Sequence, residues 1–275
     1  MMEVVPAQPS KILGMTTRDN IEAAKNFAYF VNDYFINAVI NGEEDLNYLN
    51  TLQRNNNDSD DLIIHKDWKN KSDFIGLDYY RRVYIYSSNI VSLSSARFVG
   101  GAPINDLNVE TNQSHGLLND LGWEIYPKGL YNLIMQIKTQ WNKPVLITEN
   151  GIADKSDRYR APFIVAHLHS VKQAIDDGAD VIGYLHWSFM DNYEWLDNYR
   201  SEGKFGLFSI DRNIGDRNER LYLNRQKTRG AEALELIIRK SLFQNKNEVV
   251  ADSAIVAAKN KFGIFTSDGS HIIFT

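Results

Sequence analysis

The strongest constraint on the fold of this chain is a set of short apolar runs, each followed by a segment with helical periodicity. Residues 73–80, 144–148 and 181–187 are such runs, and their composition is typical of strands buried on both faces of a sheet. Helices are predicted to open at Pro127 and Pro162, because proline suits the first helical position. This alternation predicts an α/β fold built on a parallel sheet.

Two further helices and one further strand complete the predicted elements. One helix is expected over residues 19–41, since Asp19 and Glu22 have the spacing of a capping box and Gly42 follows the last apolar position. Another is predicted near residues 226–242. The remaining strand is expected within the first fifteen residues, which gives about four βα units, whereas a complete βα barrel has eight.

Long polar stretches separate these elements and end the chain. Residues 43–72 and 87–122 are predicted to be loops, because they lack a clear periodicity. Residues 244–275 form a predicted C-terminal tail, in which Asp268–Gly269 is typical of the turn of a short hairpin. We therefore expect one folded unit over residues 1–243, followed by this tail.

The composition excludes several classes of protein. The chain has no cysteine, which excludes disulfides, thiol nucleophiles, thiolate zinc sites and iron–sulfur clusters. Its net charge of −5 provides no positive field to attract nucleic acid or an anionic membrane. The first residues lack the basic and apolar regions of a secretory signal, and no stretch reaches the ~18 apolar residues of a membrane span. These features favour a cytoplasmic protein that binds neither nucleic acid nor membrane.

The most distinctive side chains stand directly after the predicted strands. The first strand ends in Asp78-Tyr79-Tyr80, the second in Thr148-Glu149-Asn150-Gly151 and the third in His186-Trp187, with Tyr193-Glu194-Trp195 shortly after it. Ligands of parallel α/β folds bind outside the carboxyl ends of the strands, so these side chains are expected to share one site. Aromatic faces pack against sugar rings, and carboxylates and amides satisfy sugar hydroxyls. The pattern favours a carbohydrate site, and cleavage of a glycoside needs two carboxyl groups.

Structural roles are the alternative interpretation for several residues. A structural role is expected for Trp123, a core role is open for Trp187, and His186 fits a hydrogen-bonded core position. His167 and His169 lie two residues apart on a predicted helix, so they point to different faces and do not form a metal pair. Four arginines are expected to be solvated surface or loop charges: Arg81, Arg82, Arg158 and Arg160.

The same segments carry a resemblance to a known family. The runs DFIGLDYY, LGWEIYPKGLYNLI, PVLITENGIAD, RYRAPFIVAHLHSVKQAIDDGADVIGYLHWSFMDNYEW and KFGLFSID together resemble the C-terminal half of the glycoside hydrolase family 1 β-glycosidases, in their archaeal form. The resemblance covers most of residues 12–240. It implies the second half of a TIM (β/α)8 barrel, with strands five to eight in residues 1–243. It also implies a retaining β-glycosidase of β-glucosidase or β-galactosidase type.

The resemblance implies roles for individual residues. Glu149 corresponds to the nucleophile, which attacks the anomeric carbon and forms a glycosyl-enzyme intermediate, and Tyr80 to the tyrosine that hydrogen-bonds it. Glu194 corresponds to the glutamate that binds glycone hydroxyls. Family members that act on phosphorylated sugars have another residue there, so the implied substrates are unphosphorylated β-O-glycosides. No metal or other cofactor is implied. The implied substrate-binding residues are Asp78, Trp187, Glu194, Trp195 and Phe205.

Two departures from the family pattern affect these expectations. Asp78 stands where the family has Asn, and this places an additional carboxylate near Glu149. The Asn-Glu-Pro run that carries the acid/base glutamate of the family does not occur, since none of the six prolines follows Asn-Glu. The strand count and the missing run both predict half a barrel, a fragment with exposed sheet edges.

Half a barrel leaves the partner and the function open between alternatives. The missing half is expected from a complementary N-terminal half-barrel chain or from a second copy of this chain in a homo-oligomer. One function is a β-glycosidase that is active once the missing half is supplied. The other is a non-catalytic or vestigial half barrel that binds a sugar or a protein partner.

Overall fold

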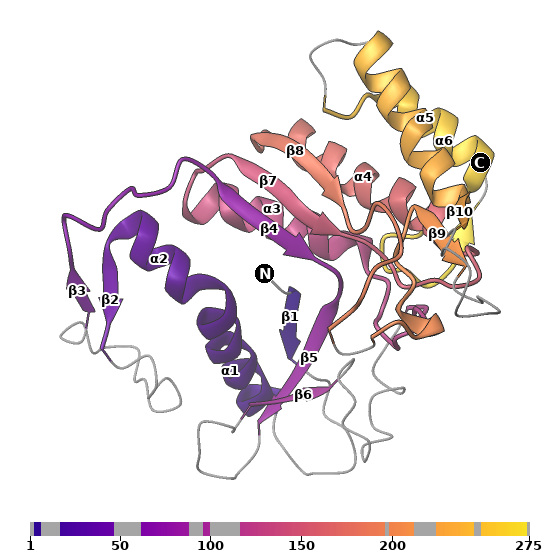
Figure 1. Ribbon diagram of the computed structural model, residues 1–275. Coiled ribbons are helices and arrows are strands. Elements are labelled where there is room, and N and C mark those ends of the chain that lie inside the picture. Colours follow the sequence, from indigo (N-terminus) through magenta and orange to yellow (C-terminus); the bar gives the residue numbers. More distant parts are fainter. Residues whose placement is uncertain are drawn as a thin grey trace, which may run out of the picture.

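A three-stranded parallel sheet forms the centre of the molecule (Figure 1). The computed structural model describes residues 3–6, 17–46, 62–87, 96–99, 116–195, 198–211, 224–244 and 249–273. The strands β4 (Ile75–Tyr79), β7 (Val145–Asn150) and β8 (Val181–His186) lie in the order β4-β7-β8. Leu77 pairs with Ile147, and Val145 pairs with Val181. The predicted α/β alternation and the three predicted strands are confirmed.

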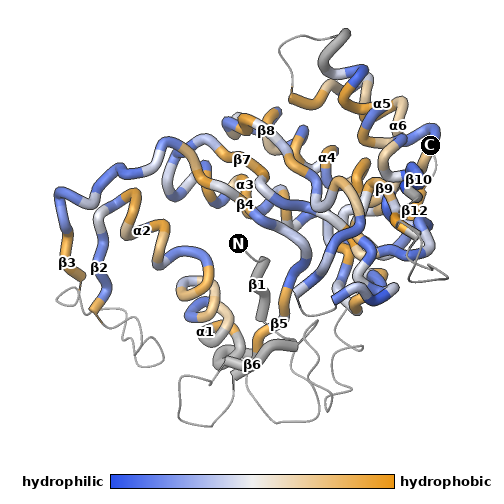
Figure 2. Tube along the Cα trace, viewed as in Figure 1, coloured by the Kyte–Doolittle hydropathy of each residue, from blue (hydrophilic) through white to orange (hydrophobic). Residues whose placement is uncertain are grey.

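Two helices cover one face of this sheet. The helices α3 (Pro127–Gln140) and α4 (Arg160–Asp176) lie behind the strands in Figure 1. Proline occupies the first turn of α3. The apolar stripe of this helix is buried together with the alternate residues Ile75 and Leu77 of β4. The helix predicted from Pro162 begins two residues earlier, at Arg160. Figure 2 shows apolar positions along β7, β8 and α4, the elements that form this core.

The other face of the sheet is open among the described residues, which corrects the expectation of strands buried on both faces. In β4 the side of Gly76 and Asp78 is exposed. In β8, Ile182 is 49 % exposed and Leu185 is 54 % exposed. Within the described residues, β4 and β8 pair on one side only, so they are edge strands. The apolar run at 181–187 therefore has the composition of a covered strand but no covering layer.

The N-terminal segment folds as a helix with a wider turn in its middle. Helix α1 (Thr17–Ala28) continues through the π-helical turn η1 (Tyr29–Asp33) into α2 (Tyr34–Asn41). The prediction of a helix over 19–41 is confirmed, although α1 begins two residues before Asp19. Gly42 ends it with φ 74°, and a Cβ atom there would lie 2.3 Å from the carbonyl oxygen of His65. Glycine is therefore required at this end.

A second sheet contains the strand expected near the N-terminus. Strand β1 (Glu3–Pro6) pairs in parallel with β5 (Arg82–Ser87), which pairs with β6 (Ala96–Val99) in antiparallel orientation. The predicted strand exists, but it does not join the central sheet, and β5 was not predicted. The expectation of four βα units along one sheet is therefore wrong for the described residues, because three strands form that sheet.

Short hairpins and two helices complete the fold. In the segment predicted to be a loop, β2 (Glu43–Asp45) pairs with β3 (Leu62–Ile64), and residues 47–61 lie outside the described residues. Hairpin β9 (Phe208–Asp211) and β10 (Asn224–Lys227) precedes α5 (Arg229–Gln244). The remaining elements are η5 (Ser201–Gly203), α6 (Asp252–Phe262), β11 (Ile264–Phe265) and β12 (Ile272–Ile273).

The C-terminal residues pack onto the central core. Ala254, Ile255, Ala258 and Phe262 of α6, which the sequence did not predict, are buried in the same apolar cluster as the sheet and α4. The hairpin predicted at Asp268–Gly269 is present as β11 and β12. None of the described helices combines the length and the hydrophobicity that crossing a bilayer requires.

Candidate active site

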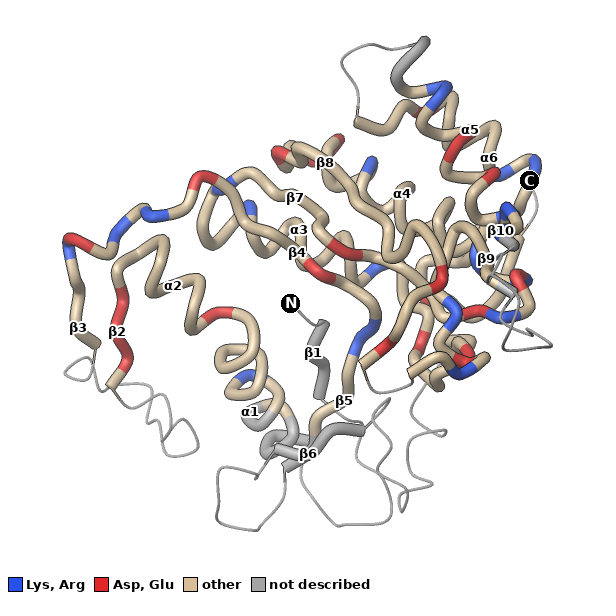
Figure 3. The backbone as a smooth tube through the Cα atoms, in the orientation of Figure 1, with Lys and Arg blue, Asp and Glu red and all other residues tan. Residues whose placement is uncertain are grey.

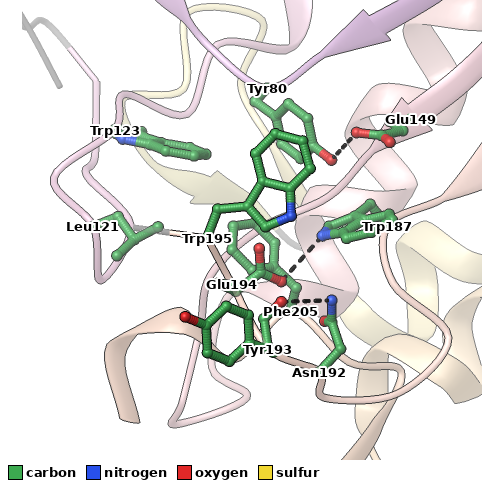
Figure 4. A pocket seen from close by; sticks show the side chains of 10 residues that line it. All are labelled: Tyr80, Leu121, Trp123, Glu149, Trp187, Asn192, Tyr193, Glu194, Trp195 and Phe205. Atoms are coloured by element: carbon green, nitrogen blue, oxygen red, sulfur yellow. Dashed lines mark hydrogen bonds between the residues drawn. The ribbon is translucent and has the colours of Figure 1, made fainter. Parts of the chain in front are cut away.

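A pocket of about 340 Å³ opens at the C-terminal ends of the three central strands (Figure 4). Figure 3 shows acidic positions at the ends of β4 and β7. Tyr80 follows β4, Glu149 stands near the end of β7, and Trp187 follows β8. The fold therefore places these side chains at the carboxyl ends of the strands, as the sequence predicted. The lining residues are Tyr80, Leu121, Trp123, Glu149, Trp187, Asn192, Tyr193, Glu194, Trp195 and Phe205.

Tyr80 and Glu149 form the central polar contact of the pocket. The Tyr80 hydroxyl donates a hydrogen bond of 2.7 Å to Oε2 of Glu149. Burial raises the pKa of Tyr80 far above its ordinary value, and the hydrogen bond to Glu149 raises it further. The phenol therefore stays protonated at neutral pH, so it remains a donor to the carboxylate.

Gly151 explains why the strand end carrying Glu149 has room to pass β8. A Cβ atom at Gly151 would lie 1.7 Å from the carbonyl oxygen of Trp187. The backbone N–H of Trp187 also donates to the carbonyl oxygen of Asn150 at 2.9 Å. Any side chain at Gly151 would push the two strand ends apart, and the pocket would lose its shape.

Glu194 reaches the same pocket from the loop after β8. The indole Nε1 of Trp187 donates to Oε1 of Glu194 at 3.2 Å. The backbone of Glu194 exchanges two hydrogen bonds with Asn198, at 2.9 and 2.6 Å, and these bonds form an antiparallel bridge. The loop thereby holds one carboxylate oxygen on an indole N–H.

Aromatic rings form most of the remaining wall. Tyr80, Trp123 and Phe205 contact each other pairwise, with ring centroids 5.8 to 6.0 Å apart. Trp195 is 91 % exposed and stands over the opening. A structural role was expected for Trp123, whereas its ring lines the pocket. The sequence around Trp123 does not predict this pocket position, because its contact partners Tyr80 and Phe205 are remote in sequence.

Asp78 is the one predicted site residue outside the pocket lining. It lies opposite Glu149 in the register of β4 and β7. Its Oδ1 accepts a hydrogen bond of 2.7 Å from the Thr148 hydroxyl. The structure therefore brings together Tyr80, Glu149, Trp187, Glu194, Trp195 and Phe205, and it places Asp78 beside them on the open face of the sheet.

Of the four arginines that were expected at the surface, Arg160 is buried and Arg82 is partly buried. Nε and Nη2 of Arg82 each donate to a carboxylate oxygen of Glu124 at 2.7 Å, and Glu124 directly follows Trp123. Arg160 is 2 % exposed and donates to Asp157 and to the carbonyl oxygens of Asp154 and Lys204. The expectation for these two is wrong, because distant segments supply their partners.

The described part of the chain contains no cluster of side chains that would form a metal site. Within the ranges that the structure covers, no group of three or more His, Asp or Glu side chains is placed to hold a metal ion. The polar groups of the pocket are two carboxylates, two phenols, the Asn192 amide and indole N–H groups. These groups suit hydrogen bonds to hydroxyls and attack by a carboxylate.

The fold and the sequence match known glycosidases over much of the chain. The profile of glycosyl hydrolase family 1 matches residues 2–229. A β-galactosidase of Saccharolobus solfataricus is 35 % identical over 190 residues, which are 69 % of this chain and 34 % of that protein. The chain thus spans about a third of the length of this curated relative.

Solved structures agree with this match. The crystal structure of the β-glycosidase from Thermosphaera aggregans superposes with a TM-score of 0.59 and 26 % identity, covering 85 % of this chain and 41 % of that one. Fpglu1 from Fervidobacterium pennivoraus gives a TM-score of 0.54 and 31 % identity, over 83 % of this chain and 42 % of that one. The resemblance found in the sequence is confirmed, and the chain belongs to glycosyl hydrolase family 1.

Proposed function

We propose that this chain carries the nucleophile half of a retaining β-glycosidase, corresponding to strands five to eight of a TIM barrel. The observation that supports this most is the pocket in which Glu149 and Glu194 face one space while Tyr80 donates to Glu149. The expected substrates are unphosphorylated β-O-glycosides of β-glucoside or β-galactoside type. The pocket volume of about 340 Å³ suits a small ligand.

Glu149 acts as the nucleophile in this proposal. Its carboxylate attacks the anomeric carbon, the bond to the aglycone oxygen breaks, and the electron pair leaves with that oxygen, which takes up a proton from an acid. Water then attacks the glycosyl ester and loses a proton, which releases the sugar and restores the carboxylate. Tyr80 holds this carboxylate in line for attack through its hydrogen bond.

Glu194 and the aromatic walls select the sugar. Glu194 accepts hydrogen bonds from glycone hydroxyls while the indole of Trp187 fixes its orientation. Trp195 and Phe205 offer apolar surfaces to the ring. None of the ten described lining residues is Lys or Arg, and a phosphate group next to Glu194 would be repelled. Unphosphorylated sugars therefore fit this site best.

In this proposal, another half barrel supplies the acid that protonates the leaving oxygen. The open face of the sheet and the exposed Ile182 and Leu185 support this, because parallel sheets are ordinarily covered on both faces. A complementary chain with strands one to four would cover this face and bring an Asn-Glu-Pro run to the pocket. A second copy of this chain would cover the face without bringing that run.

Covalent labelling tests the nucleophile and the missing acid separately. 2,4-Dinitrophenyl 2-deoxy-2-fluoro-β-glucoside has a leaving group that departs without protonation, so it needs no acid. We expect mass spectrometry to find the fluoroglucosyl group on Glu149 in the presence of the complementary half, with Glu149→Gln as the unlabelled control. A fluoroglucoside with an alkyl aglycone should label only when the acid is supplied. If neither fluoroglucoside labels Glu149 in the presence of the complementary half, the catalytic proposal is excluded.

A non-catalytic sugar-binding half barrel is the second candidate, and the missing Asn-Glu-Pro run favours it. It predicts that glucose binds with a measurable affinity in titration calorimetry while neither fluoroglucoside labels the chain. Binding together with labelling supports the enzyme, and binding alone supports this second candidate.

A further inference from the structure

The residues next to the pocket residues on the three strands form a second, buried polar layer. Successive side chains of a strand point to opposite faces, so each pocket residue has a neighbour directed towards α3 and α4. The pocket residues are Tyr80, Glu149 and Trp187, and their neighbours are Tyr79, Asn150 and His186. Tyr79 pairs with Asn150, and Asn150 pairs with His186, in the registers of β4, β7 and β8.

A continuous run of hydrogen bonds joins these neighbours across all three strands. The Tyr184 hydroxyl donates to Oδ1 of Asn150 at 2.9 Å and lies 3.1 Å from Nδ1 of His186. Nδ2 of Asn150 donates to the carbonyl oxygen of Tyr79 at 2.7 Å. We call this run, from His186 through Tyr184 and Asn150 to Tyr79, the strand-end network.

The strand-end network determines which ring nitrogen of His186 carries the proton. Because the Tyr184 hydroxyl donates its hydrogen to Asn150, it accepts from His186, which must carry its proton on Nδ1. Within the part of the chain that the structure describes, Nε2 of His186 has no hydrogen-bond partner. The bond to Tyr184 therefore fixes the ring. Burial lowers the pKa of His186 to about 3, so the ring is neutral at neutral pH.

Burial makes Tyr79 and Asn150 of this run costly to leave unpaired. Tyr79 and Asn150 are fully buried, and the Tyr79 hydroxyl is itself satisfied by the carbonyl oxygen of Tyr126 at 2.7 Å. Removing one link leaves a buried donor or acceptor without a partner, and the strand ends must shift to pair it again. A shift of Asn150 or His186 moves Glu149 or Trp187, since each pair shares a peptide bond.

We propose that Tyr184, Asn150 and His186 are positioning residues that hold the ends of β7 and β8 at the separation the sugar site requires. None of them touches the pocket, and they act through Glu149 and Trp187. This inference rests on the proposed function for its catalytic consequence. The positional consequence, a fixed orientation of the Trp187 indole, is independent of catalysis.

Removal of the Tyr184 hydroxyl tests this proposal. Tyr184→Phe keeps the ring and deletes two hydrogen bonds of the run, and Tyr131→Phe is the matched control, because the Tyr131 hydroxyl donates to exposed Asp177 away from the site. We expect Tyr184→Phe to slow labelling of Glu149 by the dinitrophenyl fluoroglucoside at least about tenfold at saturation, since a displacement of ~1 Å can slow a reaction roughly a hundredfold. Tyr131→Phe should label as the wild type does.

Nuclear magnetic resonance provides a readout that does not need activity. In the wild type, long-range ¹H–¹⁵N spectra should show His186 protonated on Nδ1 from pH 5 to 8, and the Trp187 indole N–H should shift in Tyr184→Phe but not in Tyr131→Phe. The proposal is overturned if Tyr184→Phe, with the melting temperature of the wild type, shows both an unchanged labelling rate and an unchanged indole signal. If the wild type is not labelled at all, the proposed function fails and the indole signal alone decides on the positioning role.

Discussion

At the scale of single residues, the contact of 2.7 Å between Tyr80 and Glu149 carries the first prediction. Tyr80→Phe keeps the ring against Trp123 and Phe205 but removes the hydroxyl. We expect the labelling rate of Glu149 to fall about ten- to a hundredfold, since a hydrogen bond to a charged group contributes ~1.5–3 kcal/mol. Intact-mass kinetics with the dinitrophenyl fluoroglucoside measure this rate. A rate equal to that of the wild type would show that the carboxylate is aligned without the phenol.

The charge of Glu194 carries a second prediction about single residues. Glu194→Gln keeps the size of the side chain and removes the charge that opposes a phosphate group. Glucose should bind several-fold more weakly, because charge-assisted hydrogen bonds are about twice as strong as neutral ones. Glucose 6-phosphate should bind relatively better than it does to the wild type. Titration calorimetry with both sugars checks the ratio, and a ratio that does not change would contradict this role of Glu194.

Single residues differ in how far the sequence could predict them. Tyr80, Glu149 and Glu194 stand in runs whose residue types and order are distinctive, so their place in one pocket was predictable. Arg160 was not, since a lone arginine indicates a solvated charge, and its buried position depends on a carbonyl oxygen of Lys204, which is remote in sequence. Local pattern reports the chemistry of a side chain, whereas its burial is decided by segments that arrive from elsewhere.

At the scale of elements, the π-helical turn between α1 and α2 carries the third prediction. Asp33 ends this turn, and Gln136 of α3 donates to its Oδ1 at 3.0 Å. Burial raises the pKa of Asp33 from 3.8 to about 6. The folded chain thus favours the protonated form of Asp33. The contribution of this protonated carboxyl to the free energy of unfolding is complete below pH 3.8 and is lost as the pH rises through about 6.

Asp33→Asn should therefore stabilise the chain at neutral pH. We expect the free energy of unfolding to rise by about 1–2 kcal/mol at pH 7.5, after allowance for partial exposure, and to change little at pH 4. Urea unfolding at the two pH values measures the difference. The same substitution at Asp67, an exposed residue, serves as the control. An equal effect of Asp33→Asn at both pH values would refute the ionisation of Asp33 as its cause.

Elements were predictable where one face of a segment is apolar and a proline or glycine marks its end. The helix from Pro127 and the end of the N-terminal helix at Gly42 follow from such signals. Helix α6 was missed, because its buried residues include two alanines and its other face is polar. The exposure of Ile182 and Leu185 was missed as well, since an apolar run has the same composition whether or not a layer covers it.

At the scale of the whole molecule, the central sheet has a covered face and an open face. The helices α3 and α4 bury one side, while the described residues leave Gly76 and Asp78 exposed on the other. The sequence could predict an incomplete barrel, because the three central strands were countable and a family run was missing. It could not predict that β1 pairs with β5 instead of joining the sheet, since register and neighbour choice depend on long-range packing.

The open edge of this sheet yields a prediction about association. Leu185 lies on the edge strand β8 and is 54 % exposed, so Leu185→Asp should change the free energy of unfolding by less than about 0.5 kcal/mol. It should prevent binding of a complementary half barrel, for which the N-terminal half of the Saccharolobus solfataricus relative is a suitable probe, because a buried unpaired carboxylate at the new interface is costly. Sedimentation velocity on the mixture measures the complex. Val256→Asp, at a residue of α6 that is 55 % exposed, is the matched control and should associate as the wild type does. If Leu185→Asp also associates normally, the partner does not cover the open edge at β8, and the acid would have to reach Glu149 by another route.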